Sequence, residues 1–326
     1  MVKTIIFSLS VIFFGLILGY VIQQLERKNI IQLPVSRKRI RIILQKIAIL
    51  FFVSVSFIGA IWIVKIDDIE IAFLPFLGIE AILIGGVLGL GAAKLLKLDR
   101  KKSGSMFTCG ALSNITSIGG VICYFFFGEK GYALFSLYRL FEMIIYFGVG
   151  FPIAKLFSST INAKENIISR FKKIFSDIFI IVALSSIIIG IILNLSGIKR
   201  PDFYETINAV FIPMGTILLL VSIGLEMKFG KVRDYIKECF SISMIKFILV
   251  PAIVSATAFF LGYGKIDGGL PLKVVMILSS TPVAFTALIP PSIYDLDLDL
   301  ANSCWLVTTL SLVIILPLLS CLINLV

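Results

Sequence analysis

Residues 109–120 read Cys-Gly-Ala-Leu-Ser-Asn-Ile-Thr-Ser-Ile-Gly-Gly, and residues 279–291 read Ser-Ser-Thr-Pro-Val-Ala-Phe-Thr-Ala-Leu-Ile-Pro-Pro. Both stretches lie in long apolar runs, but the first carries glycines and polar side chains and the second carries three prolines. Proline removes a backbone donor and clashes with the preceding helical turn, and glycine weakens a helix. We therefore predict that both stretches are membrane helices that break near their middles.

The composition of the whole chain supports a membrane protein. Of its 326 residues, 59% are hydrophobic and 15% are charged, which is too apolar for an ordinary soluble domain. Seven uncharged runs have close to or more than the roughly 18 residues that a spanning helix needs, and three more qualify when one or two charges are tolerated. The ten predicted spans are residues 4–25, 47–64, 71–93, 103–128, 131–154, 178–198, 206–225, 239–264, 274–294 and 300–326. The sequence thus predicts an all-α polytopic membrane protein of ten transmembrane helices, with helices 4 and 9 interrupted.

The distribution of basic residues predicts the orientation. Most of the 30 lysines and arginines lie in the loops after helices 1, 3, 5 and 7. By the positive-inside rule these loops face the cytoplasm, so both termini of this multi-pass protein are expected outside the cytoplasmic membrane. The loop after helix 9 departs from this pattern, because it holds Asp295, Asp297 and Asp299 and no basic residue.

The helix count suggests an internal repeat. Ten helices divide into two sets of five, and an odd number of spans per half places the halves in opposite orientations, which is an inverted repeat if the halves are related. The number of residues between Asn114 and Pro282 equals the number between Ala133 and Ala301, which lie at the starts of helices 5 and 10. We expect a first five-helix repeat over residues 1–157, a cytoplasmic linker over residues 158–173 and a second repeat over residues 174–326.

The two interrupted helices are the predicted solute site. Breaks at corresponding places of two inverted halves direct unpaired backbone groups at a solute near the middle of the membrane. The alternative is that small residues only permit close packing and the prolines only kink helix 9. The candidate substrate-binding residues are the polar or helix-breaking ones of the two stretches: Ser113, Asn114, Thr116, Ser117, Ser280, Thr281 and Pro282.

Charged residues inside the spans are candidates for ion coupling. A charge in hydrocarbon costs on the order of 2.5 to 3.5 kcal/mol by insertion scales, so each should face protein or water. Glu80 lies in the middle of helix 3, and Arg139 and Glu142 lie three residues apart, a spacing that allows an ion pair. Lys246 is near the start of helix 8, from which its side chain could extend to the cytoplasmic surface.

Composition excludes several kinds of chemistry. The chain has no histidine, which excludes a Ser/His/Asp triad and an HExxH zinc site, and it has no GxxxxGK loop for a nucleotide. The five cysteines lie in apolar spans without CxxC spacing and are interpreted as small core residues. Two alternatives to a transporter stay open: an intramembrane enzyme acting on lipid, with Glu80 or the three aspartates as base, and a membrane sensor.

The order of motifs resembles the auxin efflux carrier family. Residues 114–120 are Asn-Ile-Thr-Ser-Ile-Gly-Gly, residues 127–133 are Phe-Gly-Glu-Lys-Gly-Tyr-Ala, and residues 147–150 are Phe-Gly-Val-Gly. Helix 7, with Ile-Pro-Met-Gly at 212–215, helix 8, with Lys-Phe-Ile-Leu-Val-Pro at 246–251, and the prolines of helix 9 are also similar to that family. The chain differs at Gly120, where the family often has proline, so the break in helix 4 is expected to depend on glycine flexibility.

The resemblance implies both a fold and a function. The implied fold has two inverted five-helix repeats in which the broken helices 4 and 9 cross, and the family's asparagine and helix 9 proline correspond to Asn114 and Pro282. The implied function is secondary active transport of a small organic anion, a mono- or dicarboxylate, as in bacterial malate or malonate permeases. A sodium-coupled symporter of the bile-acid type is an alternative. We expect no cofactor beyond a coupling H⁺ or Na⁺ and no nucleic acid, with the solute and membrane lipid as partners; a homodimer is one assembly that this allows.

Overall fold

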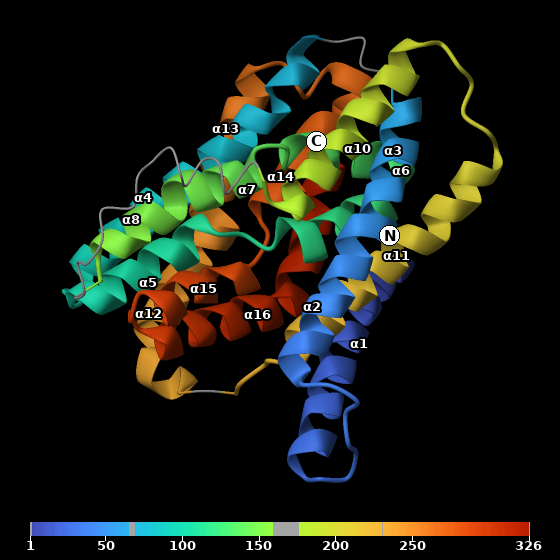
Figure 1. Ribbon diagram of the computed structural model, residues 1–326. Coiled ribbons are helices and arrows are strands. Elements are labelled where there is room, and N and C mark those ends of the chain that lie inside the picture. The colour runs from blue at the N-terminus through green and yellow to red at the C-terminus, as the bar shows by residue number, and fades with distance from the viewer. Residues whose placement is uncertain (1, 65–68, 159–175, 230, 326) are drawn as a thin grey trace. The chain divides into compact units, whose positions relative to one another are not determined.

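The computed structural model describes residues 2–64, 69–158, 176–229 and 231–325. Within these ranges the regular structure is helical, apart from one isolated antiparallel bridge between Ser113 and Val283. Figure 1 shows the helices along the chain. All but one residue of the predicted cytoplasmic linker lies outside the described residues.

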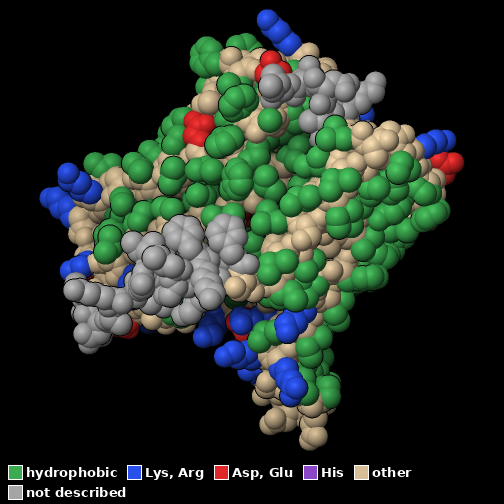
Figure 2. All heavy atoms as spheres, turned by 45° about the horizontal axis from the view of Figure 1, so that its top comes forward, with side chains coloured by type: hydrophobic (Ala, Val, Ile, Leu, Met, Phe, Trp, Pro, Cys, Tyr) green, Lys and Arg blue, Asp and Glu red, His purple; other side chains and the backbone are tan. Residues whose placement is uncertain are grey.

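Eight helices in the described part of the chain are long and apolar enough to cross a membrane. Their bounds are Val2–Arg27, Arg37–Ile63, Glu70–Leu95, Ile115–Leu156, Ile178–Leu195, Phe203–Gly224, Val232–Phe260 and Leu298–Leu325. On the face shown in Figure 2, hydrophobic side chains predominate, as expected for contact with lipid. The predicted number of ten is not reached because helices 4 and 9 are broken and because Ile115–Leu156 holds parts of two predicted helices, joined where Gly128 takes a φ of 63°. Ten helices and the inverted repeat therefore stay predictions.

The chain forms two compact units, and each unit takes residues from both halves of the sequence. The first comprises residues 1–66, 120–136 and 177–228. Its helices are α1 (Val2–Arg27), α2 (Arg37–Ile47), η1 (Ala48–Val53), α3 (Ser54–Ile63), most of α6 (Gly120–Tyr138), α10 (Ile178–Leu195) and α11 (Phe203–Gly224).

Glycines allow α1 and α11 to pack closely in the first unit. Gly19 and Gly224 face each other, and a Cβ atom on Gly224 would lie 3.0 Å from the Cα of Gly19 and still closer to the carbonyl oxygen of Leu16. Because the obstacle is backbone, which cannot move aside as a side chain can, these two helices depend on small residues for their contact.

Replacing Gly224 by valine is expected to destabilise the protein. Overpacking of a close contact costs about 1 to 3 kcal/mol, and here the contact atoms are main chain. The melting temperature of the detergent-purified protein should fall clearly below that of the wild type. The matched control is Gly91→Val, since a Cβ at Gly91 meets nothing within 4 Å. Equal melting temperatures for the two variants would contradict this account of the α1–α11 contact.

An ion-pair cluster also belongs to the first unit. Arg200 donates from Nη1 and Nη2 to the two carboxylate oxygens of Glu129, each at 2.7 Å, and Nη1 also donates to the carbonyl oxygen of Gly59 at 2.9 Å. The amide of Asn208 donates to the same carboxylate. The cluster therefore ties the turn at Gly128 to α3 and α11.

The second unit comprises residues 67–119, 137–176 and 229–326. Its longer helices are α4 (Leu74–Leu95), α5 (Arg100–Ala111), α12 (Ile236–Met244), α13 (Val250–Phe260), α14 (Leu270–Ser279) and α16 (Leu298–Leu325). Its shorter helices are η2 (Ile69–Phe73), η3 (Ile115–Gly119), α7 (Glu142–Ile145), η4 (Tyr146–Gly150), α8 (Phe151–Leu156), η5 (Val232–Tyr235), η6 (Ile245–Leu249), η7 (Ile266–Gly269), η8 (Phe285–Leu288) and α15 (Ile289–Ile293).

Both predicted helix interruptions occur, and both lie in this second unit. Helix 4 stops at Ala111 and resumes at Ile115, and helix 9 stops at Ser279 and resumes at Phe285. The expected cause of the first break is wrong: the residues between α5 and η3 include no glycine, and Leu112 has the extended angles φ −90° and ψ 116°. The glycines of helix 4 serve close packing instead, since Gly110 lies directly against the carbonyl oxygen of Gly85 on α4.

Candidate functional site

The two helix interruptions pair with each other. The Asn114 amide donates to the carbonyl oxygen of Pro282 at 2.8 Å, and the Ala284 amide donates to the carbonyl oxygen of Leu112 at 2.9 Å. These bonds satisfy backbone groups that the broken helices leave free, which matters where water is absent. We call residues 112–114 and 281–284, with the side chains around them, the crossing.

Side chains of two other helices hold the crossing in place. The hydroxyl of Tyr146 accepts a hydrogen bond from the Ser113 amide at 2.9 Å and donates to the Ser113 carbonyl oxygen at 3.1 Å. On α16, the hydroxyl of Thr308 accepts a hydrogen bond from the Val283 amide at 3.2 Å. Predicted helix 5 thus supports the break in helix 4, and predicted helix 10 supports the break in helix 9.

Lys246 lies at the crossing, where the sequence did not place it. Its side chain is 1% exposed, so the expected extension to the cytoplasmic surface is wrong. The Nζ atom donates to the hydroxyl oxygen of Ser113 at 2.7 Å. No carboxylate of the described residues forms an ion pair with it. The protonated form of Lys246 would be a buried ammonium without a compensating negative charge, which is costly, so in that form Lys246 is suited to attract an anion.

Asn114 follows Ser113 in the chain, and its side-chain amide has no hydrogen-bond partner among the described residues. The residue is 6% exposed, and its backbone accepts hydrogen bonds from Ile118 and Gly119, each at 3.3 Å. Its side chain makes no hydrogen bond to any residue that the structure describes. The side chain therefore does not cap η3, and its two donors and one acceptor are available to a solute.

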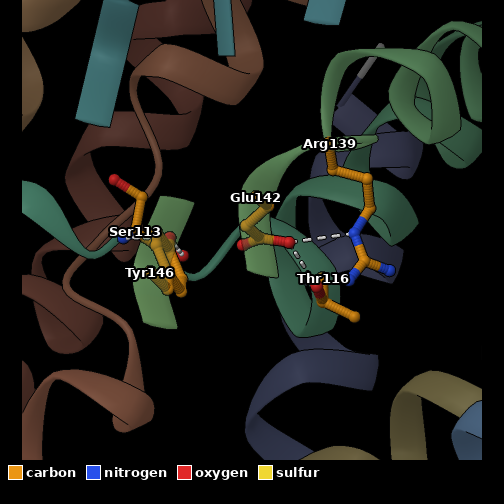
Figure 3. A network of polar contacts seen from close by, with 5 residues as sticks. All are labelled: Ser113, Thr116, Arg139, Glu142 and Tyr146. Atoms are coloured by element: carbon orange, nitrogen blue, oxygen red, sulfur yellow. Dashed lines mark hydrogen bonds and ion pairs between the residues drawn. The ribbon is translucent and has the colours of Figure 1, made fainter. Parts of the chain in front are cut away.

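Arg139 and Glu142 form the predicted ion pair next to the crossing. The Nε atom of Arg139 lies 2.9 Å from Oε2 of Glu142, and the two side chains are 9% and 4% exposed. The hydroxyl of Thr116 on η3 donates to the same carboxylate oxygen at 3.2 Å. Figure 3 shows this group beside Ser113 and Tyr146. The pair is therefore linked to helix 4 just past its break.

The remaining predicted site residues fall into two groups. Ser117, Ser280, Thr281 and Pro282 are buried in or next to the crossing, and Thr281 uses its hydroxyl on the Leu278 carbonyl oxygen at 2.8 Å. Glu80 is separate from them: its carboxylate accepts a hydrogen bond from Thr257 on α13 at 2.8 Å. Its described contacts do not include the residues of the crossing.

Three residues at the crossing were missed by sequence reasoning. Tyr146 and Thr308 look like ordinary residues of apolar helices, and no local pattern distinguishes them. Lys246 carried a usable signal, because a lysine within an apolar run must be explained. The position of Lys246 near the start of helix 8 predicted a side chain at the cytoplasmic surface, and that prediction is wrong.

Chemically, the crossing can hold an anion. Lys246 supplies a positive charge when it is protonated, the Asn114 amide supplies two donors, and the Arg139–Glu142 pair adds no net charge while both groups are ionised. Among the described residues, no group of histidine, cysteine, aspartate or glutamate could hold a metal ion.

Comparison with known proteins points to transport. An uncharacterized transporter of Methanothermobacter thermautotrophicus is 22% identical over 249 residues, which cover 76% of this chain and 78% of that protein. An uncharacterized transporter of Methanocaldococcus jannaschii is 29% identical over 251 residues, covering 74% of this chain and 73% of that protein. No family model matches the chain. The similarity to transporters, together with the apolar helices, supports a multi-pass membrane transporter rather than an enzyme.

Proposed function

We propose that the protein is a secondary active transporter of a small organic anion and that the crossing is its solute site. The observation that carries this proposal is the buried amine of Lys246, which lacks a carboxylate partner among the described residues. A mono- or dicarboxylate would supply the missing negative charge. The resemblance to auxin efflux carriers agrees with this solute class and forms part of the proposal.

The residues of the crossing take distinct roles in this proposal. Lys246 attracts the carboxylate, Asn114 donates hydrogen bonds to it, and the serine and threonine side chains of the two interruptions complete the site. Tyr146 and Thr308 keep the interruptions in position through their bonds to Ser113 and Val283. Alternating access occurs around the crossing, because broken helices provide the irregular backbone that such sites use.

Membrane potential determines which direction needs a coupling ion. An anion is repelled from the negative cytoplasm by about 2.3 kcal/mol per charge per 100 mV, so export needs no coupling and uptake needs cotransported H⁺ or Na⁺. Glu80, Arg139 and Glu142 are the residues proposed for coupling. The orientation with both termini outside the cytoplasmic membrane, based on the basic loops, belongs to the same proposal.

Solute flux in proteoliposomes tests the proposal directly. The wild-type protein should carry at least one of malonate, succinate and lactate by exchange, and empty liposomes should not. Repeating the assay with and without Na⁺ separates a sodium symporter of the bile-acid type from proton coupling. Binding without flux would indicate a sensor, and the absence of both for all three compounds would contradict the proposal.

The lipid-enzyme alternative has less support in the structure. Of the three aspartates proposed as a base, Asp297 accepts hydrogen bonds from the Leu300 amide at 2.9 Å and from the Tyr235 hydroxyl at 3.1 Å. Asp295 and Asp299 pair with Lys101 and Lys231. These contacts tie the start of α16 to neighbouring segments of its unit, which is a structural role.

A further inference from the structure

The helix α2 has an exposed face that combines cations with isoleucines. We call it the α2 face, and its six residues, all of them exposed, form two rows with a spacing of four: Lys38, Ile42 and Lys46, and Arg39, Ile43 and Ile47. Residues four apart lie one above the other along a helix. Each row therefore begins with a cation and continues into an isoleucine one turn later.

The length of the span places this face at the edge of the membrane. The span Arg37–Ile63 has 27 residues and runs from α2 through η1 into α3 (Figure 1). At about 1.5 Å per residue it is about 40 Å long, whereas the hydrocarbon core of a bilayer is about 30 Å thick. Residues 47–63 hold no charge, so the surplus length lies at the basic end. The first turns of α2 therefore lie among the lipid headgroups, on the predicted cytoplasmic side.

The α2 face has an excess of positive charge. Two other basic residues of this helix are paired, Arg37 with Glu26 and Arg41 with Glu226. The three cations of the α2 face form no ion pair with any residue that the structure describes. Their charge is therefore available to a partner outside the protein.

We propose that the α2 face binds the headgroup of an anionic phospholipid. Lys38 and Arg39 contact its phosphate, and the guanidinium suits this role because it can donate two parallel hydrogen bonds to phosphate oxygens. A helical side chain leans toward the N-terminus of its helix, so Lys46 extends its ammonium toward the same headgroup. Ile42 and Ile43, which are 36% and 44% exposed, contact the upper part of the acyl chains.

The combination of charge and apolar surface selects the kind of partner. A soluble phosphate would satisfy the cations but would leave the exposed isoleucines in water. A zwitterionic lipid carries a cation beside its phosphate, and that cation is repelled by the α2 face. An anionic membrane surface, by contrast, attracts each lysine or arginine next to it.

Lipid bound here would stabilise the first unit. The Arg41–Glu226 pair joins α2 to the residues that follow α11, and α2 also packs against α11. The α2 face and the crossing belong to different units, so binding of the lipid does not depend on the proposed solute.

The melting temperature of the full-length protein in a nonionic detergent tests the proposal. Added dioleoylphosphatidylglycerol should raise it, since a ligand of the folded state stabilises that state. Dioleoylphosphatidylcholine has the same acyl chains and should raise it less, and glycerol 3-phosphate, which has no acyl chains, should not raise it. Added salt should weaken the effect of the anionic lipid, because salt screens exposed charges.

Two triple variants assign the effect to this face. The first replaces its cations: Lys38→Gln, Arg39→Gln and Lys46→Gln. The second is the control and removes the same charge from three exposed lysines elsewhere: Lys94→Gln, Lys97→Gln and Lys237→Gln. In the first variant, the phosphatidylglycerol concentration that gives half of the increase should rise about a hundredfold, or about fivefold for each cation. The control should keep the wild-type concentration.

Three results would overturn the proposal. Equal increases with the two lipids would show that the headgroup charge is not recognised. Equal concentrations for the two triple variants would show that the α2 face is not the site. If the first variant does not fold, the single variants Arg39→Gln and Lys46→Gln decide: each should need about fivefold more lipid, and wild-type values in both would exclude the site.

Discussion

Replacing Lys246 by methionine is expected to weaken anion binding and transport strongly while leaving the protein folded. The ammonium has one hydrogen bond, to Ser113, and no carboxylate partner within the described chain, so its removal breaks no ion pair. Methionine has a similar length and avoids the cost of a buried charge. A lost hydrogen bond between the charged amine and the solute weakens binding by about 1.5 to 3 kcal/mol, or roughly 10-fold to 150-fold.

Thermal stability distinguishes binding from folding in this variant. Without solute, the melting temperature of Lys246→Met should equal or exceed that of the wild type, and added solute should no longer raise it. Lys246→Arg keeps the charge and should retain part of the binding. The control Lys94→Met removes an exposed lysine and should change neither property. Wild-type transport by Lys246→Met would remove the main support for an anion site at the crossing.

The breaks in helices 4 and 9 could be predicted because they depend on residue types. Proline blocks a helix by its own geometry, and polar side chains in an apolar run have to be explained. The form of the break in helix 4 could not be predicted. It depends on hydrogen bonds to Pro282, Ala284 and Tyr146, which are far away in the sequence.

For the ionisable residues too, contacts between neighbours in the sequence could be predicted and contacts with distant segments could not. The Arg139–Glu142 pair was predicted from a three-residue spacing, and it forms, although through a turn instead of a continuous helix. The prediction for Lys246 is wrong because it depends only on the position of the residue along helix 8. The residues of other helices that surround Lys246 cannot be read from that position. Burial in a membrane protein depends on which helices surround a residue, and a hydropathy profile does not contain that information.

Each compact unit combines helices from both halves of the sequence. The division of the sequence into halves therefore does not predict which helices pack together. The first unit joins α1, α2 and α3 to α10 and α11, and the second joins α4 and α5 to α12, α14 and α16. Residues 120–136 belong to the first unit although the segments on either side of them belong to the second. An inverted repeat along the chain is compatible with such mixing, since related helices of the two halves can join one unit.

Replacing Asn114 by alanine is the other change with a large expected effect. We expect it to abolish transport, because Asn114 directly follows Ser113, the hydrogen-bond partner of Lys246, and its side-chain amide makes no hydrogen bond in the described structure. The same fact predicts little loss of stability. The crossing is held by the backbone of Asn114, which alanine supplies equally well.

The melting temperature with and without solute tests solute binding by Asn114 against a capping role. If the amide binds solute, Asn114→Ala keeps the wild-type melting temperature without solute and loses the increase that malonate or succinate causes. If the amide instead stabilised the start of η3, the variant would melt earlier in both conditions, since loss of a helix cap costs about 1 kcal/mol. The matched control is Ser117→Ala, in η3, where a smaller loss of binding is expected because the residue lies farther along the chain from Ser113, the hydrogen-bond partner of Lys246. Wild-type transport by Asn114→Ala would exclude both roles, and the polar residues of helix 4 would then serve close helix packing.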